Sequence, residues 1–135
     1  MTKLILFILL SSLLGAFTIE SSFENAHSKA INENKILMVF LTTPKCKECN
    51  RVLQHILTDK NLSTLIEKEA IFSIIQKGQK ESYPIELLYT LEYPALFFLD
   101  KEELFVCDTL SGVIPLKSIT KCLISESQRE KKRDK

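Results

Sequence analysis

The chain has 135 residues, of which 45% are hydrophobic and 26% are charged, and its formal net charge is +1. This length and composition predict one compact domain that is large enough to bury a core, and the sequence contains no internal repeat. The near-neutral charge provides no overall field that would attract nucleic acid, so we exclude nucleic acid as a partner.

Residues 1–16 have the pattern of a secretory signal peptide. Lys3 gives a short positive start, an apolar stretch runs to Leu14, and small residues follow up to Ala16. We expect cleavage after Ala16, which places the mature protein in an exported, oxidising space of the periplasmic kind. The alternative is an uncleaved inner-membrane anchor, although the stretch is short for a full span.

The first half of the mature chain begins with a short edge strand at residues 17–19. A helix capped by Ser21 or Ser22 is predicted to follow and to end near Asn32. After a polar turn, the apolar run Ile36–Leu41 has the length of a strand that is buried on both faces.

Two cysteines stand at the start of the next predicted helix. We expect Thr43 to cap this helix and Pro44 to take its first position, so that Cys46 lies in the first turn and Cys49 one turn later. The first thiol then faces unpaired backbone N–H groups and the positive end of the helix dipole, which both favour the thiolate. We therefore assign Cys46 as the nucleophile and Cys49 as the resolving thiol of a redox pair. The apolar stripe of this helix comprises Cys49, Val52, Leu53, Ile56 and Leu57.

Charged side chains flank the nucleophile. Lys45 and Lys47 should stabilise the Cys46 thiolate, and Glu48 should oppose it. We expect these side chains to be exposed and therefore screened by water and salt, which makes each effect small.

The Cys-x-x-Cys pair has other interpretations, namely a static structural disulfide or part of a zinc site. A zinc site needs two further ligands. Neither His27 nor His55 stands at a recognisable ligand spacing, and we expect both to be surface or packing residues. We therefore predict no metal.

Shorter elements are predicted beyond the cysteine helix. In order, these are a break at residues 58–61, a helix from Leu62, a buried strand over residues 70–75, a polar loop over residues 77–82 and a short helix from Pro84 to Leu91. The elements after them are an aromatic-rich strand over residues 95–100, a hairpin partner at Glu103–Cys107, a loop over residues 108–114 and a helix from Pro115 that buries Leu116, Ile119, Leu123 and Ile124.

Strands separated by helices predict an α/β domain, with a mixed sheet that is covered on both faces. We assign this domain to residues 17–125. Residues 126–135 form a charged tail, which we expect to be solvated and frayed, with a membrane or partner contact as the alternative.

This order of elements resembles the thioredoxin fold over nearly the whole mature chain. The resemblance depends on Cys46-Lys47-Glu48-Cys49 after a buried strand, on a segment from Tyr93 to Asp100 that is similar to the family's cis-proline segment, and on Gly112 after the last strand. The segment Glu24–Phe40, a helix and polar turn leading into the central strand, is similar to exported members. The resemblance implies a central mixed sheet with helices on both faces.

The sequence also departs from the family pattern. Lys45 stands where the family has Trp, Lys47-Glu48 replaces the Gly-Pro of thioredoxins proper, and Val39 or Phe40 stands where thioredoxins have a buried Asp. With these differences, the resemblance implies neither the family's redox potential nor a built-in general base.

The resemblance assigns roles to the proline segment as well. It implies that Pro94 is preceded by a cis peptide bond and packs against the dithiol, and that Tyr93, Pro94 and Ala95 form the substrate-docking edge. The alternative is a trans proline that only starts a strand.

Cys107 and Cys122 remain after the redox pair is assigned. In the implied fold the last strand packs against the last helix, so a second disulfide between them is plausible and would close a loop of about 15 residues. Two buried free thiols are the alternative. We expect the disulfide, because the chain is predicted to be exported.

We interpret the protein as an exported thiol–disulfide oxidoreductase without a cofactor, acting as a monomer on cysteine-containing exported proteins and exchanging electrons with a membrane redox partner. The resemblance favours the reductase direction, and oxidation and isomerisation stay open. One rival is a non-catalytic thioredoxin-fold module that binds an extended segment at residues 93–95, and another is a metal-binding domain.

Overall fold

The computed structural model describes residues 17–80 and 83–134 of the chain. The predicted signal peptide, residues 1–16, lies outside these described residues, and so does part of the predicted polar loop, residues 81–82. The elements are, in order, β1 (Ile19–Glu20), α2 (Phe23–Glu33), β2 (Ile36–Thr42), α3 (Lys47–Thr58), α4 (Lys60–Glu69), β3 (Ala70–Gln76), β4 (Ala95–Leu99), β5 (Leu110–Ser111) and α5 (Leu116–Arg133). None of the helices in the described ranges is both long enough and apolar enough to span a membrane.

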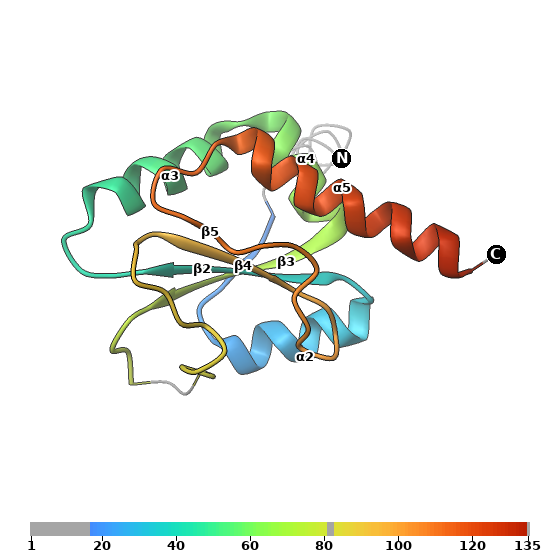
Figure 1. The fold of residues 1–135 in the computed structure, drawn as a ribbon, viewed down its shortest axis with the longest axis horizontal. Helices are drawn as coiled ribbons and strands as arrows, with labels where there is room; N and C mark the ends of the chain where they lie inside the picture. Colours follow the sequence, from blue (N-terminus) through green and yellow to red (C-terminus); the bar gives the residue numbers. More distant parts are fainter. Residues whose placement is uncertain (1–16, 81–82, 135) are drawn as a thin grey trace, which may run out of the picture.

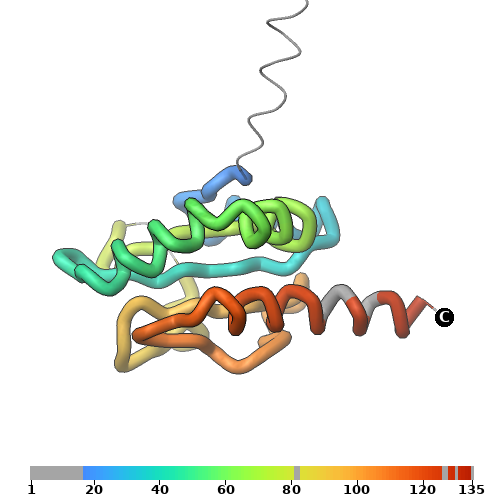
Figure 2. The backbone as a smooth tube through the Cα atoms, turned by 90° about the horizontal axis from the view of Figure 1, so that it is seen from above, coloured from blue at the N-terminus to red at the C-terminus, as the bar shows by residue number. Residues whose placement is uncertain are grey.

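A mixed sheet with the strand order β1-β3-β2-β4-β5 forms the middle layer. Strand β3 runs parallel to β1 and β2, whereas β4 runs antiparallel to both β2 and β5. Helix α2 covers one face, and α3, α4 and α5 cover the other (Figure 1). Figure 2 shows α5 beside α4 on that second face. This architecture confirms the predicted thioredoxin fold.

Strand β2 is the centre of the sheet, and its residues Ile36–Leu41 are each no more than 5% exposed. Alternate side chains point to opposite faces. Phe40 joins the cluster beneath α3, α4 and α5, whereas Val39 and Leu41 join the cluster beneath α2. This burial on both faces fixes the position of the strand, and therefore of the segment that follows Thr42.

Helix α2 begins where the sequence predicts it. The Ser22 side chain accepts a hydrogen bond from the backbone N–H of Asn25 at 3.3 Å, which identifies Ser22 as the N-cap. The helix ends at Glu33, and Asn34 takes a left-handed conformation with φ of 53°.

The short helix predicted from Pro84 does not form, and this prediction is wrong. The described residues there make a single turn in which Leu88 N–H donates to the Pro84 carbonyl at 2.9 Å. Only Leu88 is buried in the core, while Ile85 is 65% exposed and Leu91 is 86% exposed. Without a continuous apolar face against the sheet, so short a helix has little to stabilise it.

The predicted hairpin partner Glu103–Cys107 is also wrong as a strand. Phe105 makes one isolated bridge to Leu99, and the strand that pairs with the start of β4 is β5 instead. A tight turn held by Asp100 Oδ1 precedes the bridge. After it the chain leaves the sheet, and Cys107 is bonded to Cys122 of α5.

Helix α5 continues to Arg133, so the described part of the charged tail is helical rather than frayed. No Gly or Pro interrupts the sequence after Pro115. The end of α5 extends past the sheet in both views (Figures 1 and 2).

Two side chains predicted to face the core are exposed, namely Leu57 of α3 at 43% and Ile124 of α5 at 42%.

Candidate active site

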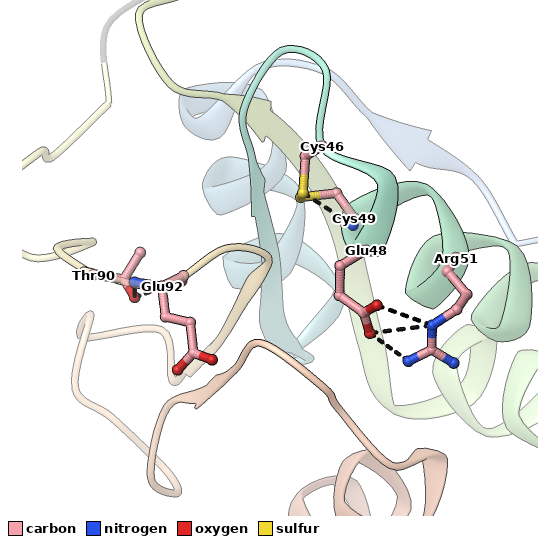
Figure 3. The surroundings of a disulfide bond; sticks show 6 residues. All are labelled: Cys46, Glu48, Cys49, Arg51, Thr90 and Glu92. Atoms are coloured by element: carbon pink, nitrogen blue, oxygen red, sulfur yellow. Dashed lines mark hydrogen bonds and ion pairs between the residues drawn. A yellow bond between two sulfur atoms is a disulfide. The ribbon is translucent and has the colours of Figure 1, made fainter.

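The segment between β2 and α3 places Cys46 at the start of the helix. Lys45 takes a left-handed conformation with φ of 58°, and Cys46 is extended with φ of −92°. The helix begins at Lys47, and its N-cap is Cys46, whose Sγ accepts a hydrogen bond from Cys49 N–H at 3.0 Å (Figure 3). The predictions that Thr43 caps this helix and that Pro44 takes its first position are therefore wrong, because the left-handed residue delays the helix by one turn.

As the N-cap, Cys46 places its sulfur closer to the positive end of the helix than a position in the first turn would. In the N-cap position the Cys46 sulfur replaces the oxygen that usually accepts from the free backbone N–H groups. In the reduced protein the same N–H group would donate to a thiolate, which favours the charged form.

Cys46 and Cys49 form a disulfide, with a Cα–Cα distance of 5.2 Å. The two cysteine residues differ in exposure. Cys49 is 1% exposed within the core cluster beneath α3, whereas Cys46 is half-buried at its edge. An external thiol or disulfide would therefore reach Cys46 first.

The predicted charged neighbours differ in their partners. Glu48 pairs with Arg51 on α3 (Figure 3), and Arg51 Nε donates to Glu48 Oε2 at 3.0 Å. The Arg51 hydrogen bond lowers the pKa of Glu48 below its ordinary value, and the same bond raises the pKa of Arg51. Lys45 and Lys47 are exposed and make no ion pair in the described part of the chain. The charge around Cys46 is thus more positive than the sequence suggests, because Arg51 partly neutralises Glu48.

The predicted docking edge, which we define as Tyr93, Pro94 and Ala95, lies at the same end of the sheet. Ala95 pairs with Leu41 near the end of β2, only a few residues before Cys46. The Tyr93–Pro94 peptide bond is cis, and Pro94 and Ala95 are buried. Tyr93 is half-buried and packs against the same core cluster as Cys46 and Cys49.

Hydrogen bonds and a ring contact extend this edge to the neighbouring strands. The Gly112 N–H donates to the Pro94 carbonyl at 2.8 Å, and the Lys77 N–H donates to the Thr42 carbonyl at 2.8 Å. The Lys77 ammonium lies 5.5 Å from the centre of the Tyr93 ring. Sequence reasoning did not single out Lys77, because its polar loop carries no pattern that places it beside Tyr93.

The histidines lie apart from the cysteine pair. His55 is exposed in the last turn of α3. His27 lies on α2, where Nε2 is 3.2 Å from the Lys101 carbonyl and Nδ1 is 3.5 Å from Glu103. Within residues 17–80 and 83–134, no three His, Cys, Asp or Glu side chains are grouped so that they could hold a metal ion.

Cys107 and Cys122 form a second disulfide, with a Cα–Cα distance of 5.8 Å. It joins the segment between β4 and β5 to helix α5. Cys122 is 7% exposed and belongs to the core cluster beneath α3, α4 and α5. The described part of the chain contains no free cysteine.

Comparison with known proteins agrees with the fold. A family model described as thioredoxin-like matches residues 18–101. A thioredoxin from Thermus thermophilus has 17% sequence identity and a TM-score of 0.66 over 84% of this chain and 88% of its own.

Two further solved structures are similar. A putative disulphide-isomerase from Bacteroides thetaiotaomicron has 22% identity and a TM-score of 0.64, covering 78% of this chain and 87% of its own. The DsbH oxidoreductase has 16% identity and a TM-score of 0.61, covering 82% and 86%. No curated protein sequence matches the chain.

Proposed function

Because the chain belongs to the thioredoxin-like family, we propose that it is a thiol–disulfide oxidoreductase whose reacting pair is Cys46 and Cys49. The observation that carries this proposal is the unequal burial of the two sulfurs. The half-buried sulfur caps a helix and can meet a substrate, whereas the buried one can be reached only by its neighbour.

The reaction is a sequence of two thiol–disulfide exchanges. In the reduced protein the Cys46 thiolate attacks a substrate disulfide, forms a mixed disulfide and expels one substrate thiolate. Cys49 then loses its proton and attacks the Cys46 sulfur, which releases the second substrate thiolate and leaves the Cys46–Cys49 disulfide. Two electrons pass to the substrate, and the reverse sequence oxidises a substrate dithiol.

We assign substrate docking to the edge formed by Tyr93, Pro94 and Ala95. Tyr93 precedes β4, so it lies outside the pairing between β2 and β4. An extended substrate segment that approaches the exposed side of Cys46 would meet this edge next to the disulfide.

The cellular setting is part of the same proposal. Residues 1–16 support export, and the Cys107–Cys122 disulfide suits an oxidising space. The substrates would then be cysteine-containing exported proteins. A membrane protein would supply electrons for the reductase direction, which we favour, and the protein would act as a monomer without a cofactor.

Insulin reduction by the purified protein, with dithiothreitol as electron donor, tests the function. We expect Cys46→Ser to abolish turnover and Cys49→Ser to accumulate a mixed disulfide with insulin, because the second exchange is then blocked. The matched control, Cys107→Ala with Cys122→Ala, should keep turnover. Full activity of Cys46→Ser would refute the proposal, and a wild-type protein that binds extended peptides without reducing insulin would support a binding module instead.

A further inference from the structure

The carboxylate of Glu92 lies over Gly112, beside the docking edge. Gly112 has φ of +70°, and a Cβ atom added there would collide with Oε1 and Cδ of Glu92. Ser111 Oγ donates to Glu92 Oε2 at 3.4 Å. The absence of a side chain at Gly112 therefore makes room for the carboxylate, which a hydroxyl from β5 holds in place.

The backbone of Glu92 is fixed as well. Its N–H donates to Thr90 Oγ1 at 3.2 Å, and the same hydroxyl donates to the Glu92 carbonyl at 2.8 Å (Figure 3). Both backbone groups of Glu92 thus bind one side chain, immediately before Tyr93. Glu92 is exposed, and it makes no ion pair with any described residue. A carboxylate on a fixed backbone, with no ion pair to a described residue, is available to a partner.

The strand order places Lys77 and Glu92 on opposite sides of the docking edge. The ends of β3, β2, β4 and β5 follow one another, so Lys77, Thr42, Pro94 and Gly112 lie in that order. Lys77 is on the β3 side, and Glu92 is on the β5 side. A substrate segment that crosses the docking edge therefore meets positive charge at one end and the Glu92 carboxylate at the other.

We propose that Glu92 is a specificity-determining residue, which selects substrates that carry Lys or Arg next to the reacting cysteine. This inference rests on the proposed function, since it concerns how a substrate is bound for exchange at Cys46. A basic side chain at the β5 end would form a charge-assisted contact with Glu92, whereas an acidic one would be repelled.

The test measures exchange between the reduced protein and peptides whose single cysteine carries a mixed disulfide with glutathione. The peptides differ in one residue, which is Lys, Gln or Glu and stands directly before the cysteine in one set and directly after it in the other, and the preference is expected in the set whose varied residue meets Glu92. For wild type we expect kcat/KM to be about fivefold higher with Lys than with Glu, chiefly through KM, and the ratio to fall at high salt. Glu92→Gln should remove the preference, and Glu92→Lys should reverse it.

Glu86→Gln is the matched control, because Glu86 is an exposed glutamate in the preceding turn and the substitution makes the same change in charge. It should keep the wild-type preference. If wild type exchanges with all peptides at equal rates, or if Glu92→Gln keeps the preference, this inference is overturned and the oxidoreductase remains. If wild type exchanges with no peptide and does not reduce insulin, the proposed function fails, and the inference fails with it.

Discussion

Glu48 lies between the two cysteines in sequence, yet its carboxylate points along α3 towards Arg51 (Figure 3). The hydrogen bond from Arg51 lowers the pKa of Glu48, so Glu48 stays ionised at any pH at which a thiol reacts. Its charge opposes a thiolate at Cys46, but the guanidinium one turn away offsets part of that effect. We therefore expect the two opposite charges to have a small net effect on the reactivity of Cys46.

Removing one member of this pair should change the reactivity of Cys46. With Arg51→Gln, the uncompensated Glu48 carboxylate should slow alkylation of reduced Cys46 by iodoacetamide about twofold at mildly acidic pH, and Glu48→Gln should accelerate it by a similar factor. Arg133→Gln, the same change at the far end of α5, is the control and should have no effect. Equal rates in Arg51→Gln and wild type would show that solvent screens the pair completely.

The same pair makes a prediction about pH and stability. The pKa of Glu48 is lower in the folded protein than its ordinary value of 4.5, so the pair stabilises the fold above that pH, and the stabilisation disappears as the pH falls through the lowered value. Glu48→Gln should therefore be slightly less stable than wild type at neutral pH and equally stable at a pH below the lowered pKa. Urea unfolding across this range measures the difference, and a gap that widens on acidification would contradict the assignment.

Among the secondary-structure elements, Asp59 ends one helix and begins the next. Its N–H donates to the His55 carbonyl at 3.2 Å, and its Oδ1 accepts from Leu62 N–H at 2.8 Å. The sequence predicts a break over residues 58–61, but the structure narrows it to this single residue. The Asp59 side chain thus caps α4 directly where α3 ends.

Replacing this cap should destabilise the protein without affecting catalysis. Asp59→Ala should lower the free energy of unfolding by about 1 kcal/mol, because the Leu62 N–H loses its acceptor, whereas Asp59→Asn should keep most of the stability. Urea unfolding followed by far-UV circular dichroism measures both. Asn61→Ala, a substitution at an exposed position of the same turn, is the control. An Asp59→Ala variant as stable as wild type would show that water replaces the cap fully.

The sequence predicts the buried elements well, because their signals are local. Strand β2 is a continuous apolar run, and α3 carries a periodic apolar stripe, so the pattern of apolar residues alone identifies both elements. The segments after residues 84 and 103 are different. In the first, only Leu88 is buried in the core, and the second leaves the sheet where Cys107 is bonded to Cys122, which only the tertiary structure shows.

In the candidate site, too, some features have a local sequence signal and others depend on the tertiary structure. The spacing of Cys46 and Cys49 is readable from the sequence, but the helix start is not, because nothing in the identity of Lys45 marks a left-handed conformation. Glu92 carries no sequence signal either, since its position depends on Gly112, which is distant in the chain.

At the scale of the whole molecule, the Cys107–Cys122 disulfide fixes the segment between β4 and β5 to α5. Arg129 Nη1 donates a hydrogen bond to the Val106 carbonyl at 3.3 Å, so a disulfide and a hydrogen bond both join α5 to this segment. Gly112 lies after the fixed segment and bonds to Pro94 of the docking edge. The disulfide thus supports the β5 side of the docking edge.

Removing this disulfide should affect stability far more than chemistry. It links residues 15 apart, so Cys107→Ala with Cys122→Ala should lower the free energy of unfolding by about 3 kcal/mol in the chain-entropy model. Urea unfolding under oxidising conditions measures the change. The control, Cys46→Ala with Cys49→Ala, opens a link between residues only 3 apart and should cost less, because a short loop restricts the unfolded chain less. If the first variant unfolds at the same urea concentration as wild type, the two cysteines act as packed thiols rather than as a stabilising bond.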